Sequence, residues 1–154
     1  MPTDLTFLMG KFPAELPGDL RYALTNHMWC RMVAGRARFG FTAYAVRLMQ
    51  DVYFLDWVVS AGDEVRQLQH IGHIETSKAE SDLYAPLSGV IVAFNQDLLK
   101  DPSAINVDKY GAGWLFEMEG DTSPLRDVTD YHAHLAANWE KTQAVIKGKI
   151  NTED

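Results

Sequence analysis

The chain has 154 residues, which suffices for one domain with a buried core but leaves no room for a second full unit. Hydrophobic residues make up 47% and charged residues 23%, as in ordinary soluble globular proteins. The net charge of −7 argues against a nucleic-acid partner, because no basic patch could offset phosphate repulsion, and it favours partners with basic docking surfaces.

The N-terminal segment, residues 1–20, is expected to be an extension without regular structure. Pro13, Pro17 and Gly18 interrupt any regular element there. The apolar side chains of this segment could still attach it to the rest of the protein.

The middle of the chain is rich in strand signals. Seven segments show alternation, β-branched residues or flanking turn residues. They are residues 27–33, 36–41, 51–59, 65–77, 79–84, 89–95 and, through a glycine turn, 110–118. Two short helices interrupt them: Thr42 and Asn95 are the predicted N-caps, and the helices end near Met49 and Pro102.

The C-terminal segment, residues 123–148, predicts a long amphipathic helix packed on the sheets. Ser123 is the predicted N-cap, Pro124 the first helical residue, and Gly148 the end. The apolar stripe follows helical spacing. It consists of Leu125, Val128, His132, Leu135, Trp139 and Ile146. The chain is thus divided into an extension (1–20), a body (21–122) and a helix (123–148).

The most informative segment is residues 72–89, where Lys78 lies midway between two strand-like stretches. This arrangement predicts a hairpin whose tip presents one lysine to solvent. Two similar stretches, residues 62–65 and 86–90, flank the hairpin in the manner of a fold built from two pseudo-symmetric halves.

This hairpin resembles the lipoyl-lysine hairpin of the glycine cleavage H protein family, whose usual pattern is Glu-x-x-Lys-Ala-x-Ser-Asp. The matching residues are Glu75, Lys78, Ala79, Ser81 and Asp82. Ser77 distinguishes the segment from biotin domains, which usually have methionine there, and from dehydrogenase lipoyl domains, which usually have aspartate. The resemblance covers about residues 20–119 and includes His27-x-Trp29, Gly40-Phe-Thr42-x-x-Ala45, Asp51 to Phe54, Asn95 and Tyr110-Gly-x-Gly-Trp114.

The resemblance implies a mainly β fold: a flattened lipoyl/biotinyl-type barrel (hammerhead) of two antiparallel sheets, with short helices and a long C-terminal helix. It also implies a monomeric carrier rather than an enzyme, with lipoic acid joined as an amide to Lys78. Lipoate ligase or lipoyl transferase would recognise the hairpin, and dihydrolipoamide dehydrogenase would be a further partner. The implied recognition residues are Glu75, Ser77, Ala79, Ser81 and Asp82.

A cleft in which the lipoyl arm rests is the second implied feature, and it departs from the family pattern. The expected cleft residues are His27, Met28, Cys30 and Leu48. Met28 replaces the carboxylate of the usual His-Glu-Trp, and Leu48 stands where a polar or histidine side chain is common. A cationic aminomethyl group would lose its charge partner there, at a cost of about a few kcal/mol.

These departures favour a less cationic cargo. The favoured hypothesis is transfer of a sulfur intermediate to a heterodisulfide-reductase-like complex, as in the divergent lipoate-binding proteins of dissimilatory sulfur oxidation. The alternative is the H protein of the glycine cleavage system, which carries the aminomethyl group between glycine cleavage enzymes. An interaction module without cofactor is a further alternative, against which the intact neighbours of Lys78 argue.

The remaining reactive side chains are interpreted as structural. Cys30 shares a strand face with Met28 and Met32 and is expected in the core, with exchange with the lipoyl dithiolane as the alternative. His70 and His73, three apart on a strand, are expected on opposite faces, so no metal site is predicted. Three features of the sequence predict a cytoplasmic protein. There is a single cysteine, the N-terminus has no basic run, and no apolar run approaches the ~20 residues of a membrane span.

Overall fold

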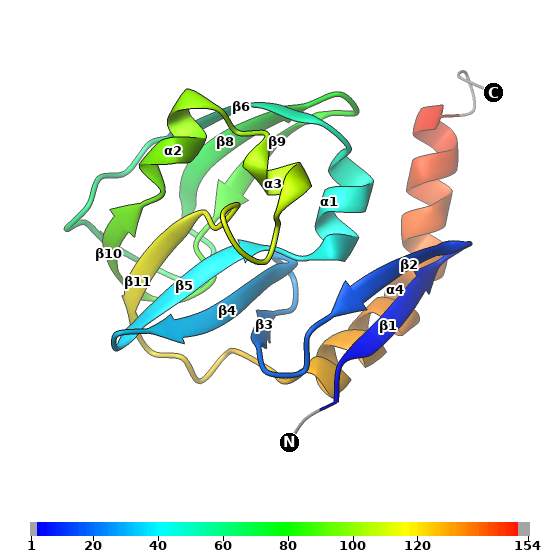
Figure 1. The fold of residues 1–154 in the computed structure, drawn as a ribbon, viewed down its shortest axis with the longest axis horizontal. Coiled ribbons are helices and arrows are strands. Elements are labelled where there is room, and N and C mark those ends of the chain that lie inside the picture. The colour runs from blue at the N-terminus through cyan, green and yellow to red at the C-terminus, as the bar shows by residue number, and fades with distance from the viewer. Residues whose placement is uncertain (1–2, 151–154) are drawn as a thin grey trace.

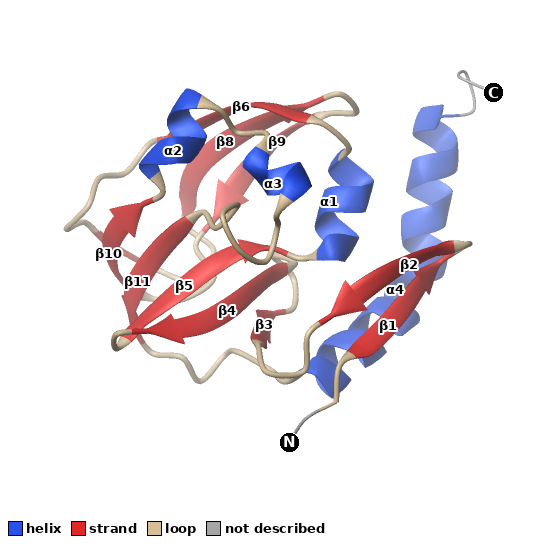
Figure 2. Cartoon of the chain, in the orientation of Figure 1, coloured by secondary structure: helices blue, strands red, loops and turns tan. Residues whose placement is uncertain are grey.

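The protein folds into two antiparallel sheets with a hairpin and a long helix at one end (Figure 1; Figure 2). The computed structural model describes residues 3–150, with side chains to residue 144. The strands are β1 (Leu5–Met9), β2 (Phe12–Leu16), β3 (Arg21–Ala23), β4 (Met28–Val33), β5 (Arg36–Phe41), β6 (Val52–Trp57), β7 (Glu64–Val65), β8 (His70–Thr76), β9 (Glu80–Tyr84), β10 (Gly89–Phe94) and β11 (Phe116–Gly120). The helices are α1 (Ala43–Met49), α2 (Gln96–Lys100), α3 (Ala104–Val107) and α4 (Val128–Ile150).

The sheet topology agrees with the expected fold class. One sheet has six strands in the order β3-β4-β5-β11-β10-β7, and the other has three in the order β6-β8-β9. Strands β1 and β2 form a separate hairpin. The mainly β architecture with two main antiparallel sheets, short helices and a C-terminal helix is therefore confirmed.

Local capping explains both predicted short helices. The Thr42 hydroxyl accepts a hydrogen bond from the Ala45 amide at 3.3 Å, at the start of α1. The Asn95 side chain accepts from the Asp97 amide and donates to two carbonyls of the 110–114 turn, which fixes α2 against that turn. Helix α3 was not predicted.

The two similar stretches that flank the lysine hairpin pair with each other. Val65 lies opposite Gly89 and Glu64 opposite Val90, in an antiparallel ladder between β7 and β10. Gly89 is required at this point, since a Cβ atom there would lie 2.2 Å from the Glu119 carbonyl oxygen of the neighbouring strand.

Two separate groups of apolar side chains stabilise the fold. The larger lies between the two main sheets and includes Met28, Cys30, Phe39, Ile71, Ile74, Leu87, Ile91, Phe116 and Met118. The second joins the body to the β1–β2 hairpin and α4, and it includes Phe7, Met9, Ala14, Leu16, Tyr22, Trp29, Tyr44, Tyr131 and Leu135. The hairpin and α4 are thus attached to the body through one shared core.

The N-terminal segment is more ordered than the sequence suggested. Residues 5–16 form a two-stranded hairpin, so the expectation of no regular element was wrong. Gly10, at φ +64°, supplies the positive φ that a two-residue hairpin turn needs. Pro13 is tolerated because each strand of an isolated pair has one unpaired edge, where a missing N–H costs nothing. Side chains of Phe7 and Leu16 then bury against α4 and the body.

Helix α4 begins later than predicted. Ser123 is not its N-cap, because the chain remains extended at Arg126, which forms a two-bond bridge with Tyr22. The helix starts at Val128, and the Asp127 carboxylate accepts from the Asp130 amide as the N-cap. Val128 and Leu135 are buried as expected, while the side chain of Ile146 falls in the part whose side chains are not described. The helix continues to Ile150, so the prediction that it ends at Gly148 was wrong. Among the described residues, no helix is long and apolar enough to cross a bilayer.

Candidate functional site

Lys78 lies at the tip of the β8–β9 hairpin, where the sequence placed it. The tip consists of three residues, Ser77, Lys78 and Ala79, between the last residue of β8 and the first of β9. The side chains of Ser77 and Lys78 are exposed, and Ala79 is half-buried. Small neighbours on both sides leave room for an enzyme to close over the lysine.

Thr76 organises this tip and was not singled out from the sequence. Its buried hydroxyl accepts hydrogen bonds from the amides of Lys78 and Ala79, each at 3.2 Å. The same hydroxyl lies 3.1 Å from the Ala79 carbonyl, which also accepts from the Thr76 amide at 2.9 Å. A threonine directly before a three-residue turn is the sequence signal for such local bonding.

The tip is also attached to Asp51, the residue directly before β6. The Ser77 amide donates to the Asp51 carbonyl at 2.9 Å, and the Asp51 amide donates to the Ser77 hydroxyl at 3.2 Å. These two bonds hold the base of the lysine in a fixed position, so that a long side chain would start from a rigid point.

A pocket of about 290 Å³ opens beside the hairpin. Its lining residues come from the loop before β4, from β4 and β5, from α1, and from β8 and β9. They are Thr25, Asn26, His27, Met28, Phe41, Ala45, Leu48, Met49, Ile74, Ser81, Asp82, Leu83 and Tyr84. Since Ser81 is three residues beyond Lys78, about 10 Å of extended chain separates the tip from the pocket.

The structure brings together three of the four expected cleft residues. His27, Met28 and Leu48 all line the pocket. Cys30 does not, because it lies in the core between the two main sheets with 3% of its surface exposed. Burial raises the pKa of the Cys30 thiol to about 12, so the reactive thiolate is suppressed.

The hairpin residues divide between two places. Ser81 and Asp82 line the pocket, whereas Glu75 lies on the outer face of the hairpin next to His73. The Asp82 carboxylate itself is turned to that outer face, because Asp82 lies opposite His73 in the ladder and its Oδ1 is 3.3 Å from His73 Nδ1. Thr25 and Asn26 add further polar groups from the opposite side.

The expectation that His70 and His73 lie on opposite faces was wrong. The register of β8 against β9 shifts between His70 and Gly72, so one residue of β8 has no partner and the alternation of faces is interrupted. Both imidazoles consequently approach the same carboxylate: His70 Nε2 is 3.5 Å and His73 Nδ1 is 3.3 Å from Asp82 Oδ1.

His27 connects the pocket to α4. Its Nδ1 lies 3.0 Å from the hydroxyl of Tyr131, which lies 2.8 Å from the hydroxyl of Thr42, the cap of α1. Burial, with a smaller contribution from nearby His134, lowers the pKa of His27 from 6.5 to about 4. A neutral imidazole therefore forms this part of the pocket wall near neutral pH.

The depressed pKa of His27 predicts an acid-dependent loss of stability. The imidazole of His27 binds a proton more readily in the unfolded chain than in the folded one. The free energy of unfolding should therefore be highest above pH 6.5 and should fall by up to about 3 kcal/mol as the pH approaches 4. His27→Asn should flatten this slope in urea unfolding measured between pH 7 and pH 4, and asparagine tolerates the φ of +54°. The control His132→Asn, on α4, should keep the wild-type slope; an unchanged slope in His27→Asn would refute the assignment.

The fold and the site together define a class of protein. Two antiparallel sheets, an exposed lysine at a short hairpin tip and an adjoining pocket are the features of a lipoyl/biotinyl-type carrier domain. The family model described as "Glycine cleavage H-protein" matches residues 20–142. The chain belongs to the glycine cleavage H-protein family.

Individual relatives agree with this assignment. The glycine cleavage system H protein of Mycolicibacterium vanbaalenii is 36% identical over 131 residues, covering 80% of this chain and 98% of its own length. That of Nocardia farcinica is 41% identical over 120 residues, with 75% and 87% covered. The crystal structure of a glycine cleavage system H protein from Mycobacterium marinum superimposes with a TM-score of 0.67 at 32% identity, covering 78% of this chain and 98% of that one.

Members of this family are carriers, not enzymes, and hold lipoic acid covalently on a lysine. The residues present fit that group. Lys78 is exposed on a tip fixed by Thr76 and Asp51, and the pocket three residues away offers both apolar walls and polar groups.

Proposed function

We propose that this protein is the lipoyl carrier of a glycine cleavage system, with lipoic acid bound as an amide to Lys78. The observation that carries the proposal is the position of Lys78, exposed on a rigid tip next to a pocket of about 290 Å³. When bound, the lipoyl group supplies the dithiol that accepts and releases the cargo. Within this proposal residues 21–122 are the carrier body, residues 1–20 an extension, and residues 123–148 a helical addition.

The chain's own residues have distinct roles in this proposal. Thr76 and Asp51 fix the starting point of the arm through their hydrogen bonds at the tip. Met28 and Leu48 provide apolar walls, and Ser81 provides a polar residue on the hairpin side of the pocket. A rigid base with a shaped pocket keeps the loaded arm out of water until an enzyme docks.

The pocket walls and the names of the relatives bear on the identity of the cargo. Met28 and Leu48 leave a cationic aminomethyl group without an evident charge partner, and Thr25, Asn26 and Ser81 are the uncharged polar residues beside them. The H-protein names of the relatives favour glycine cleavage. The proposed partners are accordingly the glycine cleavage enzymes, dihydrolipoamide dehydrogenase, and lipoate ligase or lipoyl transferase.

Sulfur transfer is the less supported alternative. It rests on the thioether and aliphatic walls formed by Met28 and Leu48. No relative reported above is named for a sulfur pathway, so a heterodisulfide-reductase-like partner stays a prediction from the sequence.

The proposed cargo can be tested by loading the carrier. Wild-type protein, prepared in fully lipoylated form, should accept one aminomethyl group from glycine decarboxylase supplied with glycine. The measurement is the intact mass of the carrier before and after the reaction. Lys78→Arg is the control and should gain no mass, because it lacks the exposed amine to which lipoate would be joined.

Two results would count against these assignments. A wild-type carrier that accepts no aminomethyl group would reject glycine cleavage and favour sulfur transfer. An equal gain of mass in Lys78→Arg and the wild type would instead reject Lys78 as the attachment site.

A further inference from the structure

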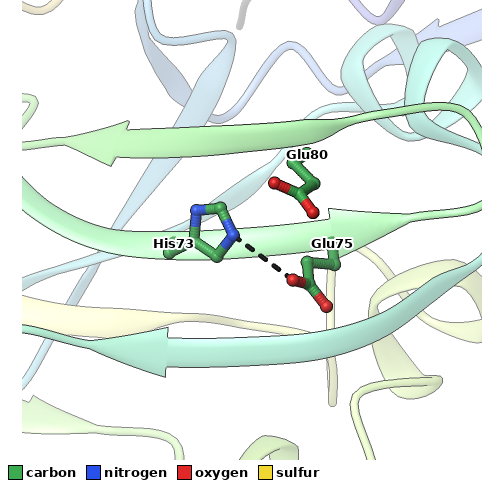
Figure 3. A group of neighbouring side chains, drawn as sticks. All are labelled: His73, Glu75 and Glu80. Carbon is green, nitrogen blue, oxygen red and sulfur yellow. Dashed lines mark ion pairs between the residues drawn. The ribbon is translucent and has the colours of Figure 1, made fainter.

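A group of imidazole and carboxylate side chains lies on the outer face of the lysine hairpin, outside the pocket described above. His73 and Glu75 come from β8, and Glu80 comes from β9 (Figure 3). The ligand atoms of these three residues all lie within 4.8 Å of one another. Figure 3 shows the His73 ring turned towards the Glu75 carboxylate, with Glu80 approaching from the neighbouring strand.

The register of the hairpin brings these residues together. Glu75 lies directly opposite Glu80, and His73 lies directly opposite Asp82. Two like charges in directly opposed positions destabilise a sheet by a few tenths of a kcal/mol or more. A cation bound between Glu75 and Glu80 would convert this repulsion into attraction.

The orientation of His73 is suited to metal binding. Its Nδ1 is 3.3 Å from Asp82 Oδ1, and its Nε2 is 3.6 Å from Glu75 Oε1. In the tautomer that donates from Nδ1 to Asp82, the lone pair of Nε2 faces Glu75. A carboxylate that orients the far side of a ligating imidazole is the usual outer-shell arrangement at protein metal sites.

The spacing also matches a particular coordination geometry. Ligand atoms 2.0–2.2 Å from a tetrahedral zinc ion lie roughly 3.5 Å from one another. The His73–Glu75 separation of 3.6 Å is already close to that value. Glu80 has an exposed side chain, and its ligand atom lies within 4.8 Å of those of His73 and Glu75.

His70 plays a different part in this surface. Its Nε2 lies 2.8 Å from the carbonyl oxygen of Gly72 and 3.5 Å from Asp82. The ring is therefore engaged by the backbone and by the carboxylate that orients His73, and it is not among the three grouped ligands.

We propose that His73, Glu75 and Glu80 bind a divalent transition metal ion of the zinc type, with water completing the coordination sphere. An imidazole with two carboxylates suits Zn²⁺, whereas Mg²⁺ and Ca²⁺ prefer all-oxygen sites. The site lies on the two strands that carry Lys78, so a bound ion would reduce the negative charge beside the modified lysine. It depends on its own residues and not on the carrier function proposed above.

The test is titration calorimetry of the full chain with ZnCl₂ after removal of metal by a chelator and dialysis. Wild-type protein should bind one Zn²⁺ per chain, and His73→Gln should weaken binding by at least about tenfold, the effect seen when even an outer-shell partner is lost. Glu80→Gln should do the same, and its exposed position leaves the fold intact. His132→Gln removes an imidazole from α4 and should leave the affinity unchanged.

Three outcomes would overturn the site. The first is no saturable Zn²⁺ binding by wild-type protein; the second is equal binding in wild type, His73→Gln and Glu80→Gln. The third is a loss in His132→Gln as large as that in His73→Gln. Titration with MgCl₂ provides the selectivity test, since comparable affinity for Mg²⁺ would mean that the acidic side chains alone, and not the imidazole, hold the ion.

Discussion

Lys78→Arg should abolish lipoylation of this protein completely. Arginine preserves the positive charge at the exposed hairpin tip, but its guanidinium group remains protonated and is not a substrate for amide formation with lipoate. The measurement is intact mass after expression with lipoate and a lipoate ligase. Wild-type protein should gain one lipoyl group per chain, and Lys78→Arg should gain none.

The specificity of this result depends on a matched control. Lys100→Arg changes another exposed lysine, at the end of α2, and should be modified like the wild type. Thermal unfolding of the unmodified proteins should be the same for all three, because an exposed lysine at a turn contributes little to packing. A lipoyl group on Lys78→Arg, found at any other lysine by peptide mapping, would show that the attachment site is misassigned.

Features set by local chemistry were predictable from the sequence. The two helix caps, Thr42 and Asn95, depend on a side chain and an amide only two or three residues apart, and both were predicted. The hairpin around Lys78 was also predicted, because alternating apolar residues on both arms fix its register.

Features that depend on long-range pairing were not predictable. The bridge between Tyr22 and Arg126 delays the start of α4, and nothing near Ser123 signals that distant partner. The bulge after His70 likewise depends on how β8 pairs with β9. Simple alternation would put His70 and His73 on opposite faces, but the bulge places both on the same face as Asp82.

The composition of the pocket combines both kinds of feature. Met28 and Leu48 were assigned to it from the family pattern, and the structure places them there. Ser81 was interpreted only as a hairpin residue, because its position at the pocket follows from long-range packing that brings β9 beside residues of α1 and β4.

The hydroxyl of Tyr131 joins α4 to the pocket, and this connection yields the largest stability prediction. Tyr131 is fully buried, its ring stacks on Tyr22 with centroids 4.7 Å apart, and its hydroxyl contacts both His27 and Thr42. Tyr131→Ala should lower the free energy of unfolding by about 3–5 kcal/mol, the range for a buried aromatic residue truncated to alanine. Since the free energy of unfolding of a whole domain is about 5–15 kcal/mol, this variant should be close to unfolding at physiological temperature.

Tyr131→Phe separates the hydrogen bonds from the packing. It keeps the stacked ring but leaves Thr42 and His27 without the hydroxyl, which should cost about 1–3 kcal/mol in urea unfolding. Tyr22→Phe is the matched control, because its hydroxyl donates to one backbone carbonyl, that of the half-buried Pro17, so its cost should be at or below about 1 kcal/mol. If Tyr131→Phe were no more destabilised than Tyr22→Phe, α4 would be attached by packing alone, and the pocket would be independent of the helix.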